Sequence, residues 1–183
     1  AQRLLSLDEI VDAWVSGARF KFIAMIILVL AWSMSEISRE LHTADFLIAS
    51  LGNSLPAAAL PAVIFVLAAF TAFSTGSSWG AMGILLPLVL PLCWAIMSME
   101  GLTAGEDYFI LYSSVSGVLA GAVWGDHCSP ISDTTVMSSL SAGCDHIEHV
   151  RTQLPYALLA GAAALGAGTL PTSFGLPWWL GML

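Results

Sequence analysis

The sequence predicts an all-α integral membrane protein: a polytopic helical bundle in which two helical segments are interrupted or re-entrant. Hydrophobic residues make up 57% of the 183 residues and charged residues only 10%, whereas soluble domains carry about 25% charged residues. The mean hydropathy is +0.84. No Asp, Glu, Lys or Arg occurs from Phe46 to Met99 or from Thr152 to Leu183. Since roughly 20 apolar residues cross a bilayer, both stretches predict membrane helices.

The N-terminal segment predicts an amphipathic helix over residues 6–19, lying before the membrane. Ser6 and Glu9 fit a capping box, and the apolar residues that follow recur at helical spacing on one face. Arg19 and Lys21 then stand at the entrance of the first predicted membrane helix, about residues 22–38. Basic residues at this end favour a cytoplasmic location for it.

The first interrupted segment runs over residues 57–73, breaks at 74–80 and resumes over 81–97. The break has the sequence Ser-Thr-Gly-Ser-Ser-Trp-Gly. A single helix from 57 to 97 would be roughly 60 Å long, about twice the hydrocarbon thickness of a bilayer. The chain is therefore expected to turn back or re-enter at this break.

The second interrupted segment runs over residues 108–124, breaks at 125–135 and resumes over 136–144. Pro130 lacks a backbone donor and biases Ser129 away from helix. Irregular backbone at membrane depth is tolerated only where it is buried in protein or lines a watery cavity, and paired interrupted helices point to a transporter's binding site. Three glycines at four-residue spacing predict a close approach by another helix: Gly117, Gly121 and Gly125.

The remaining segments give the expected sidedness. The loop 98–107 carries three acids and no bases, which favours the non-cytoplasmic side. The loop 145–153 carries Arg151 and favours the cytoplasmic side. The last membrane helix is expected over about 155–171, with Pro155 in its first turn.

The candidate ion-binding residues lie in and beside the two breaks. Asp126 and Asp133 fall at membrane depth, where an ionisable residue is a functional-site hypothesis by default. Na⁺ is a hard cation that takes oxygen ligands, and both aspartates are its candidate metal ligands. Burial raises the pKa of a carboxyl group and a nearby cation lowers it, so one carboxylate that holds either Na⁺ or H⁺ is a minimal exchanger. The other candidate ion-binding or transport residues are Thr75, Ser77, His127, Ser129, Ser132, Thr134 and Thr135.

Other interpretations of these residues stay open. Either aspartate could cap a half-helix, and His127 could shuttle protons or be a hydrogen-bonded structural histidine. Catalytic residues and cofactors are not expected, apart from the transported Na⁺ and H⁺. A zinc site is disfavoured because the spacing of its potential ligands fits no common pattern: Cys128, Cys144, His146 and His149.

The string Gly-Asp-His-Cys-Ser-Pro-Ile-Ser-Asp-Thr-Thr at 125–135 resembles the NhaC-type sodium/proton antiporter family. Ser138-Ser139, the run from Cys144 to Tyr156 and the hydroxyl-rich break at 74–80 are similar to the same family. The resemblance implies a place in the ion transporter superfamily, with multiple spans, re-entrant hairpins and an elevator-like or rocking cycle. It also implies that this chain is the C-terminal half of a longer antiporter.

The predicted function is therefore secondary active exchange of Na⁺ for H⁺ across the cytoplasmic membrane of a bacterium or archaeon, not enzymatic catalysis. The expected partners are the lipid bilayer, small cations and the N-terminal half of the same transporter, and homo-oligomer formation stays open. With a net charge of −8 and five basic residues, nucleic acid is not an expected partner. One alternative is a Na⁺/H⁺-coupled exchanger of organic anions such as malate and lactate, although no membrane-embedded Arg is available to pair with them. Another is an accessory subunit that transports nothing itself.

Overall fold

The computed structural model describes residues 6–42, 46, 49 and 55–177. Within these residues every regular element is helical, so the all-α prediction is confirmed. Four stretches of the described chain are long and apolar enough to cross a membrane, Ala57–Thr75, Ser78–Met99, Gly105–Cys128 and His146–Ser173. The α-helices are α1 (Leu7–Glu40), α3 (Leu60–Thr75), α4 (Ser78–Met99), α5 (Tyr108–Cys128), α6 (Asp133–Ala142), α7 (His146–Ala163) and α8 (Leu170–Ser173). The short elements are the 3₁₀ turns η1 (Ala57–Ala59) and η2 (Gly105–Asp107) and the π-helical η3 (Ala164–Thr169).

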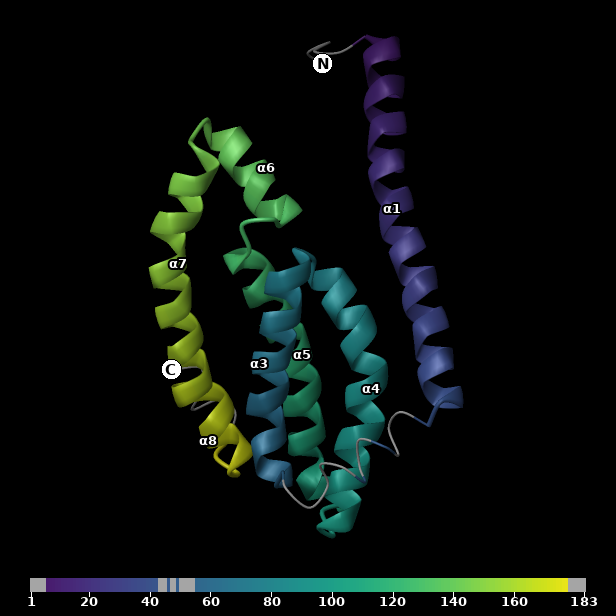
Figure 1. Cartoon of the computed structure of the whole chain (residues 1–183), viewed down its shortest axis with the longest axis vertical. Coiled ribbons are helices and arrows are strands. Elements are labelled where there is room, and N and C mark those ends of the chain that lie inside the picture. The colour runs from purple at the N-terminus through teal and green to yellow at the C-terminus, as the bar shows by residue number, and fades with distance from the viewer. Residues whose placement is uncertain (1–5, 43–45, 47–48, 50–54, 178–183) are drawn as a thin grey trace.

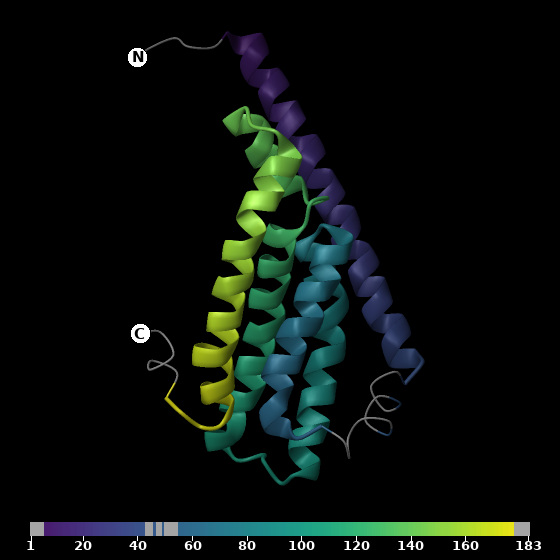
Figure 2. The same cartoon turned by 60° about the vertical axis from the view of Figure 1, so that its left-hand side comes forward.

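Helices α3, α4, α5 and α7 form a bundle in which successive helices alternate in direction, so that α3 and α5 run parallel, and α1 runs along the outside next to α4 (Figure 1). The short helix α6 continues beyond the end of α5 before the chain turns back into α7 (Figure 2). The loop between α4 and α5 lies at the end of the bundle opposite the α6–α7 turn, an arrangement that fits the opposite sidedness expected for these two loops.

Helix α1 (Leu7–Glu40) joins two segments that the sequence predicts as separate helices. The capping box is confirmed, because the Ser6 amide donates to Glu9 Oε2 at 2.7 Å and the Glu9 amide donates to Ser6 Oγ at 3.3 Å. Hydrogen bonds from the Ser6 amide and hydroxyl hold the pKa of the exposed Glu9 carboxyl below its usual value.

The expected division between 6–19 and 22–38 is wrong, since α1 is continuous. Gly17 alone costs only about 1 kcal/mol in a helix and does not end it. Many side chains of 22–38 lie outside the described set, so its membrane placement stays a prediction.

The predicted close helix approach is confirmed between α3 and α5. A Cβ atom built on Gly117 would lie 2.8 Å from the carbonyl oxygen of Pro61. One turn and two turns further on, Cβ atoms on Gly121 and Gly125 would overlap the main chain of α3. The two backbones therefore touch without a side-chain layer between them, which is the packing that small residues permit in membranes.

The first break is shorter than the expected 74–80. Only Gly76 and Ser77 separate α3 from α4. Gly76 has φ 67°, the left-handed conformation typical of a residue that ends a helix. Ser77 caps the next helix, its hydroxyl accepting from the Gly80 amide at 3.2 Å. The chain turns back here, as expected, but helix α4 begins before residue 81 because Ser77 supplies the cap.

The second break is likewise shorter than 125–135. Helix α5 continues through Cys128, so only 129–132 are non-helical. Pro130 restricts the residue before it and does not act on the turn before that. The N-cap of α6 is Ser132, whose hydroxyl accepts from the Thr134 amide at 3.2 Å. Asp133 is therefore the first helical residue, and Asp126 lies in the last turn of α5; the capping interpretation is wrong for both.

Helix α7 begins at His146 rather than near Pro155. Asp145 caps it by accepting from the Glu148 amide at 3.0 Å. The expected loop 145–153 is mostly helix, and Pro155 lies inside α7 instead of in its first turn. An aspartate followed three residues later by glutamate is a helix-start signal that outweighs the isolated proline.

Candidate ion-binding site

The two breaks lie against one another at one end of the bundle (Figure 1). The hydroxyl of Ser129, in the second break, donates to the carbonyl of Phe73 in the last turn of α3 at 2.7 Å. The same hydroxyl accepts from the Ile131 amide at 3.3 Å. Gly76 packs on Ile131 so closely that a Cβ there would lie 2.8 Å from the Ile131 carbonyl oxygen. Residues more than 50 positions apart in the chain thus form one junction.

Asp126 is the buried carboxylate at this junction, with 7% of its surface exposed. Its Oδ1 accepts from the Ser132 hydroxyl at 2.9 Å, and its Oδ2 accepts from the Thr134 hydroxyl at 3.1 Å. The two hydroxyl oxygens are 2.7 Å apart. These three side chains place four oxygen atoms together, and we call them the oxygen cluster. The last turn of α5, the break and the first turn of α6 each contribute one member.

Asp133 stands apart from the oxygen cluster. Its side chain is exposed, and no hydrogen bond joins it to the described residues. Thr135 is buried and donates to the carbonyl of His127 at 3.4 Å. That carbonyl also accepts from Gln153 Nε2 at 2.7 Å, and the same amide nitrogen lies 3.0 Å from His127 Nε2. Gln153, on α7, ties the end of α5 to its neighbour and was not among the residues that the sequence singled out.

The candidate residues of the first break are turned toward their own helices. Thr75 is exposed and donates to the carbonyl of Thr71 at 2.9 Å. The Ser77 hydroxyl serves as the cap of α4. Neither hydroxyl is hydrogen-bonded to the oxygen cluster, so the first break supports the junction through backbone packing instead.

An apolar cavity of about 490 Å³ lies beside the junction, between α3, α5 and α7. Phe65, Trp124, Gly125 and Cys128 are among its walls, and the oxygen cluster is not. Such walls offer no oxygen ligand for a cation. The indole of Trp124 donates to the Ala157 carbonyl at 2.8 Å and fixes α5 to α7 along this cavity.

Replacing Ser129 with alanine is expected to loosen the junction. The change removes the bond to Phe73 and leaves that carbonyl and the Ile131 amide without this partner, at a cost of about 1–3 kcal/mol. The thermal unfolding midpoint of the purified intact protein in detergent measures it. Ser138→Ala is the control, because the Ser138 hydroxyl is exposed and bonds only within its own helix, to the Thr134 carbonyl. Equal midpoints for the two variants would contradict the assigned role of Ser129.

Comparison with known proteins gives the family. The model of the Na⁺/H⁺ antiporter family matches residues 1–170. An uncharacterized protein of Haemophilus influenzae is 42% identical over 165 residues, which cover 90% of this chain and 30% of that protein. The malate-2H(+)/Na(+)-lactate antiporter of Bacillus subtilis is 27% identical over 152 residues, covering 82% of this chain and 25% of the relative. An uncharacterized Na(+)/H(+) antiporter of Haemophilus influenzae is 27% identical over 161 residues, which cover 86% of this chain and 27% of that relative.

No solved structure matches the chain. The chain spans 30% or less of the length of these three relatives. The family match nevertheless covers nearly the whole chain and includes both breaks and the oxygen cluster. This integral membrane protein belongs to the Na⁺/H⁺ antiporter family.

Proposed function

We propose that the chain acts as one part of a longer secondary transporter that exchanges Na⁺ for H⁺ across the cytoplasmic membrane of a bacterial or archaeal cell. The observation that carries this proposal is the buried carboxylate of Asp126, held among hydroxyl groups where two helices are interrupted. Membership of an antiporter family supports the transport class, and a relative named as a Na(+)/H(+) antiporter supports the pair of ions.

The oxygen cluster suits a dehydrated Na⁺. A hard cation binds carboxylate and hydroxyl oxygens, and both hydroxyls retain lone pairs while donating to Asp126. Ser132 and Thr134 are positioned by the cap of α6, because the Ser132 hydroxyl also accepts the Thr134 amide. The cation would replace the hydroxyl protons as the partner of the carboxylate, and the hydroxyls would rotate to present oxygen.

Exchange follows from one carboxylate serving two ligands. Asp126 would bind Na⁺ when ionised and release it when protonated, so the two ions would alternate on one group. Asp126 itself is buried, whereas Thr134 in the same oxygen cluster is exposed. Asp133, exposed at the start of α6, would attract cations to the junction or complete the site when the transporter changes shape. The supporting candidates would be the hydroxyls of Thr75, Ser77, Ser129 and Thr135, with His127 beside the route of the proton.

A second candidate is an exchanger of organic anions coupled to Na⁺ or H⁺. It is favoured by one observation, the similarity to a relative named as a malate-2H(+)/Na(+)-lactate antiporter. The oxygen cluster would then hold the coupling ion, and the anion would bind elsewhere in the intact transporter.

Everted membrane vesicles that contain the intact transporter distinguish the two candidate functions. With a pH gradient imposed by respiration and reported by a fluorescent amine, Na⁺ alone is expected to collapse the gradient. Vesicles from cells that lack the transporter are the control. An absence of Na⁺-dependent collapse over a broad pH range, together with uptake of radiolabelled malate or lactate into proteoliposomes, would replace the first candidate with the second.

A further inference from the structure

Two histidines at the start of α7 share one buried hydroxyl. Ser139 on α6 is 1% exposed, and its Oγ lies 3.0 Å from Nδ1 of His146 and 2.7 Å from Nδ1 of His149. The same oxygen lies 2.9 Å from the Thr135 carbonyl. On its other side, His146 places Nε2 at 2.6 Å from the carbonyl oxygen of Pro130 in the second break. His146 therefore connects α7 to both α6 and the break.

Counting protons fixes what these contacts allow. A carbonyl only accepts, so Nε2 of His146 carries the hydrogen in its contact with Pro130. The Ser139 hydroxyl has one proton to donate. If that proton goes to the Thr135 carbonyl or to Nδ1 of His149, Nδ1 of His146 must donate as well, and the ring of His146 is a cationic imidazolium. If the proton goes to Nδ1 of His146, the ring is neutral. Protonation of His146 at Nδ1 therefore requires the Ser139 hydroxyl to rotate away from it.

The Pro130 carbonyl lies between two residues of the break whose side chains are held by hydrogen bonds. Ser129 on one side of it is tied to Phe73, and Ser132 on the other side is tied to Asp126. We propose that His146 is a positioning residue of the ion site: by donating to the Pro130 carbonyl it holds the break in the shape that presents Ser132 to Asp126, and it holds most strongly when protonated. The contact of 2.6 Å is short, as charge-assisted hydrogen bonds are. The proposal rests on the proposed function in taking the oxygen cluster as the ion site, and the contact of His146 with the break is tested separately from it.

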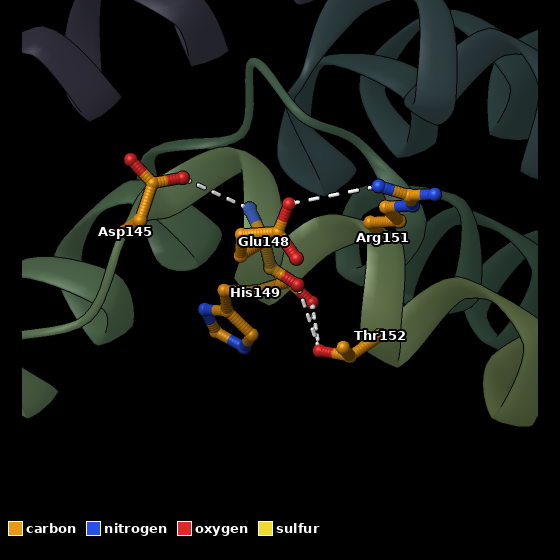
Figure 3. A network of polar contacts seen from close by, with 5 residues as sticks. All are labelled: Asp145, Glu148, His149, Arg151 and Thr152. Atoms are coloured by element: carbon orange, nitrogen blue, oxygen red, sulfur yellow. Dashed lines mark hydrogen bonds and ion pairs between the residues drawn. The ribbon is translucent and has the colours of Figure 1, made fainter.

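The other ionisable groups near His146 lie on the first turns of α7, in the α6–α7 turn and across the break. Figure 3 shows the first turns of α7, where Glu148 pairs with Arg151 at 3.7 Å and Asp145 accepts from the Glu148 amide. The His149 ring points to a different side of α7 from that ion pair (Figure 3). From the α6–α7 turn, the Cys144 thiol lies 3.7 Å from the Ser139 carbonyl. Across the break stand Asp126 and His127 at the end of α5 and Asp133 at the start of α6.

The test compares two substitutions in the intact transporter. His146→Ala removes the donor to Pro130 and is expected to raise the apparent KM for Na⁺ about tenfold, the equivalent of a lost charge-assisted hydrogen bond. His146→Gln keeps an N–H of similar reach but does not titrate near neutral pH. The His146→Gln variant is expected to have a KM for Na⁺ within about twofold of that of the unmodified protein. The pH dependence of its KM is expected to be flatter. Glu148→Gln is the matched control on the same turn, with a profile like that of the unmodified protein because its exposed ion pair contributes little.

A second readout does not need transport. Ile131 is exposed next to Pro130, so Ile131→Cys, in a background with the other reactive cysteines replaced, reports the break through its rate of maleimide labelling. Rates are compared between variants at one pH, where thiol ionisation is shared. His146→Ala is expected to label several-fold faster. The difference between the unmodified His146 protein and His146→Gln is expected to shrink as pH rises, because the neutral imidazole then donates like the neutral amide. Equal rates in all three proteins, or a His146→Gln pH profile equal to that of the unmodified protein, would overturn the proposal. The expected labelling pattern without Na⁺-dependent exchange in any variant would uphold the role of His146 in shaping the break and reject the proposed function.

Discussion

Replacing Asp126 with asparagine is expected to abolish Na⁺-driven proton movement in the intact transporter at every pH. Asparagine keeps the size of the side chain and can still bond to Ser132 and Thr134, whose hydroxyls rotate to donate or accept. It removes the charge that would hold the cation and the group that would carry the proton. Collapse of an imposed pH gradient in everted vesicles measures the loss, and the amount of protein in the membrane is expected to stay near normal.

Asp133→Asn is the matched control, since it makes the same chemical change on an exposed side chain at the first residue of α6. A change confined to KM is expected there, with exchange retained. If Asp126→Asn exchanges normally and Asp133→Asn does not, the two carboxylates have the reverse of their proposed roles. If both variants exchange like the unmodified protein, neither carboxylate carries the ions.

Gly125→Ala is expected to be the most destabilising single-methyl change in the described bundle. Its new Cβ would overlap the backbone of Ala69, and backbone cannot move aside as a flexible side chain can. Overpacking of this kind costs about 3 kcal/mol or more where the backbone must shift. The measurement is the yield and thermal unfolding midpoint of the purified intact protein. Gly166→Ala is the control, because nothing lies within 4 Å of a Cβ at that position.

A second substitution separates backbone overlap from side-chain overlap. Gly161→Ala would place its Cβ 2.5 Å from the ring of Trp124, so a smaller residue at 124 is expected to recover part of the lost stability. Ala69→Gly is expected not to rescue Gly125→Ala, since the overlapping atoms at 69 are main-chain atoms. Rescue by Ala69→Gly, or a Gly125→Ala protein as stable as Gly166→Ala, would show that the backbones of α3 and α5 do not touch at this turn.

Most of the fold was predictable from composition and from the spacing of a few residue types. The charge-free stretches predicted the membrane helices, and the four-residue glycine spacing predicted the α3–α5 contact, because both depend on local residue type. The extent of the breaks could not be predicted in the same way. Pro130 acts on Ser129 alone, and whether the preceding turn of α5 unwinds depends on α3, against which Gly125 packs.

The residue types of the candidate site could be read from the sequence, but their arrangement could not. An aspartate next to serines and threonines at membrane depth indicated an oxygen-ligand site, but the sequence ranked Asp126 and Asp133 together. Exposure separates them, because Asp126 is buried in the last turn of α5 and Asp133 is exposed at the first residue of α6. The contacts of His146 and Gln153 join residues 16 and 26 positions apart. No periodic pattern marks such pairs.

The contact between α3 and α5 also constrains how the protein moves. Main chain lies on main chain at three successive turns, which leaves no compressible layer of side chains in which one helix could slide past the other. Both breaks follow directly on helices of this pair, at the same end, and the Ser129 hydroxyl bonds the second break to the end of α3. The pair is therefore a single mechanical part, and an ion held by the oxygen cluster would travel with it. In the proposed exchanger, exposure of that ion to one side of the membrane and then the other would require displacement of this part against its surroundings, and not a hinge between the two breaks.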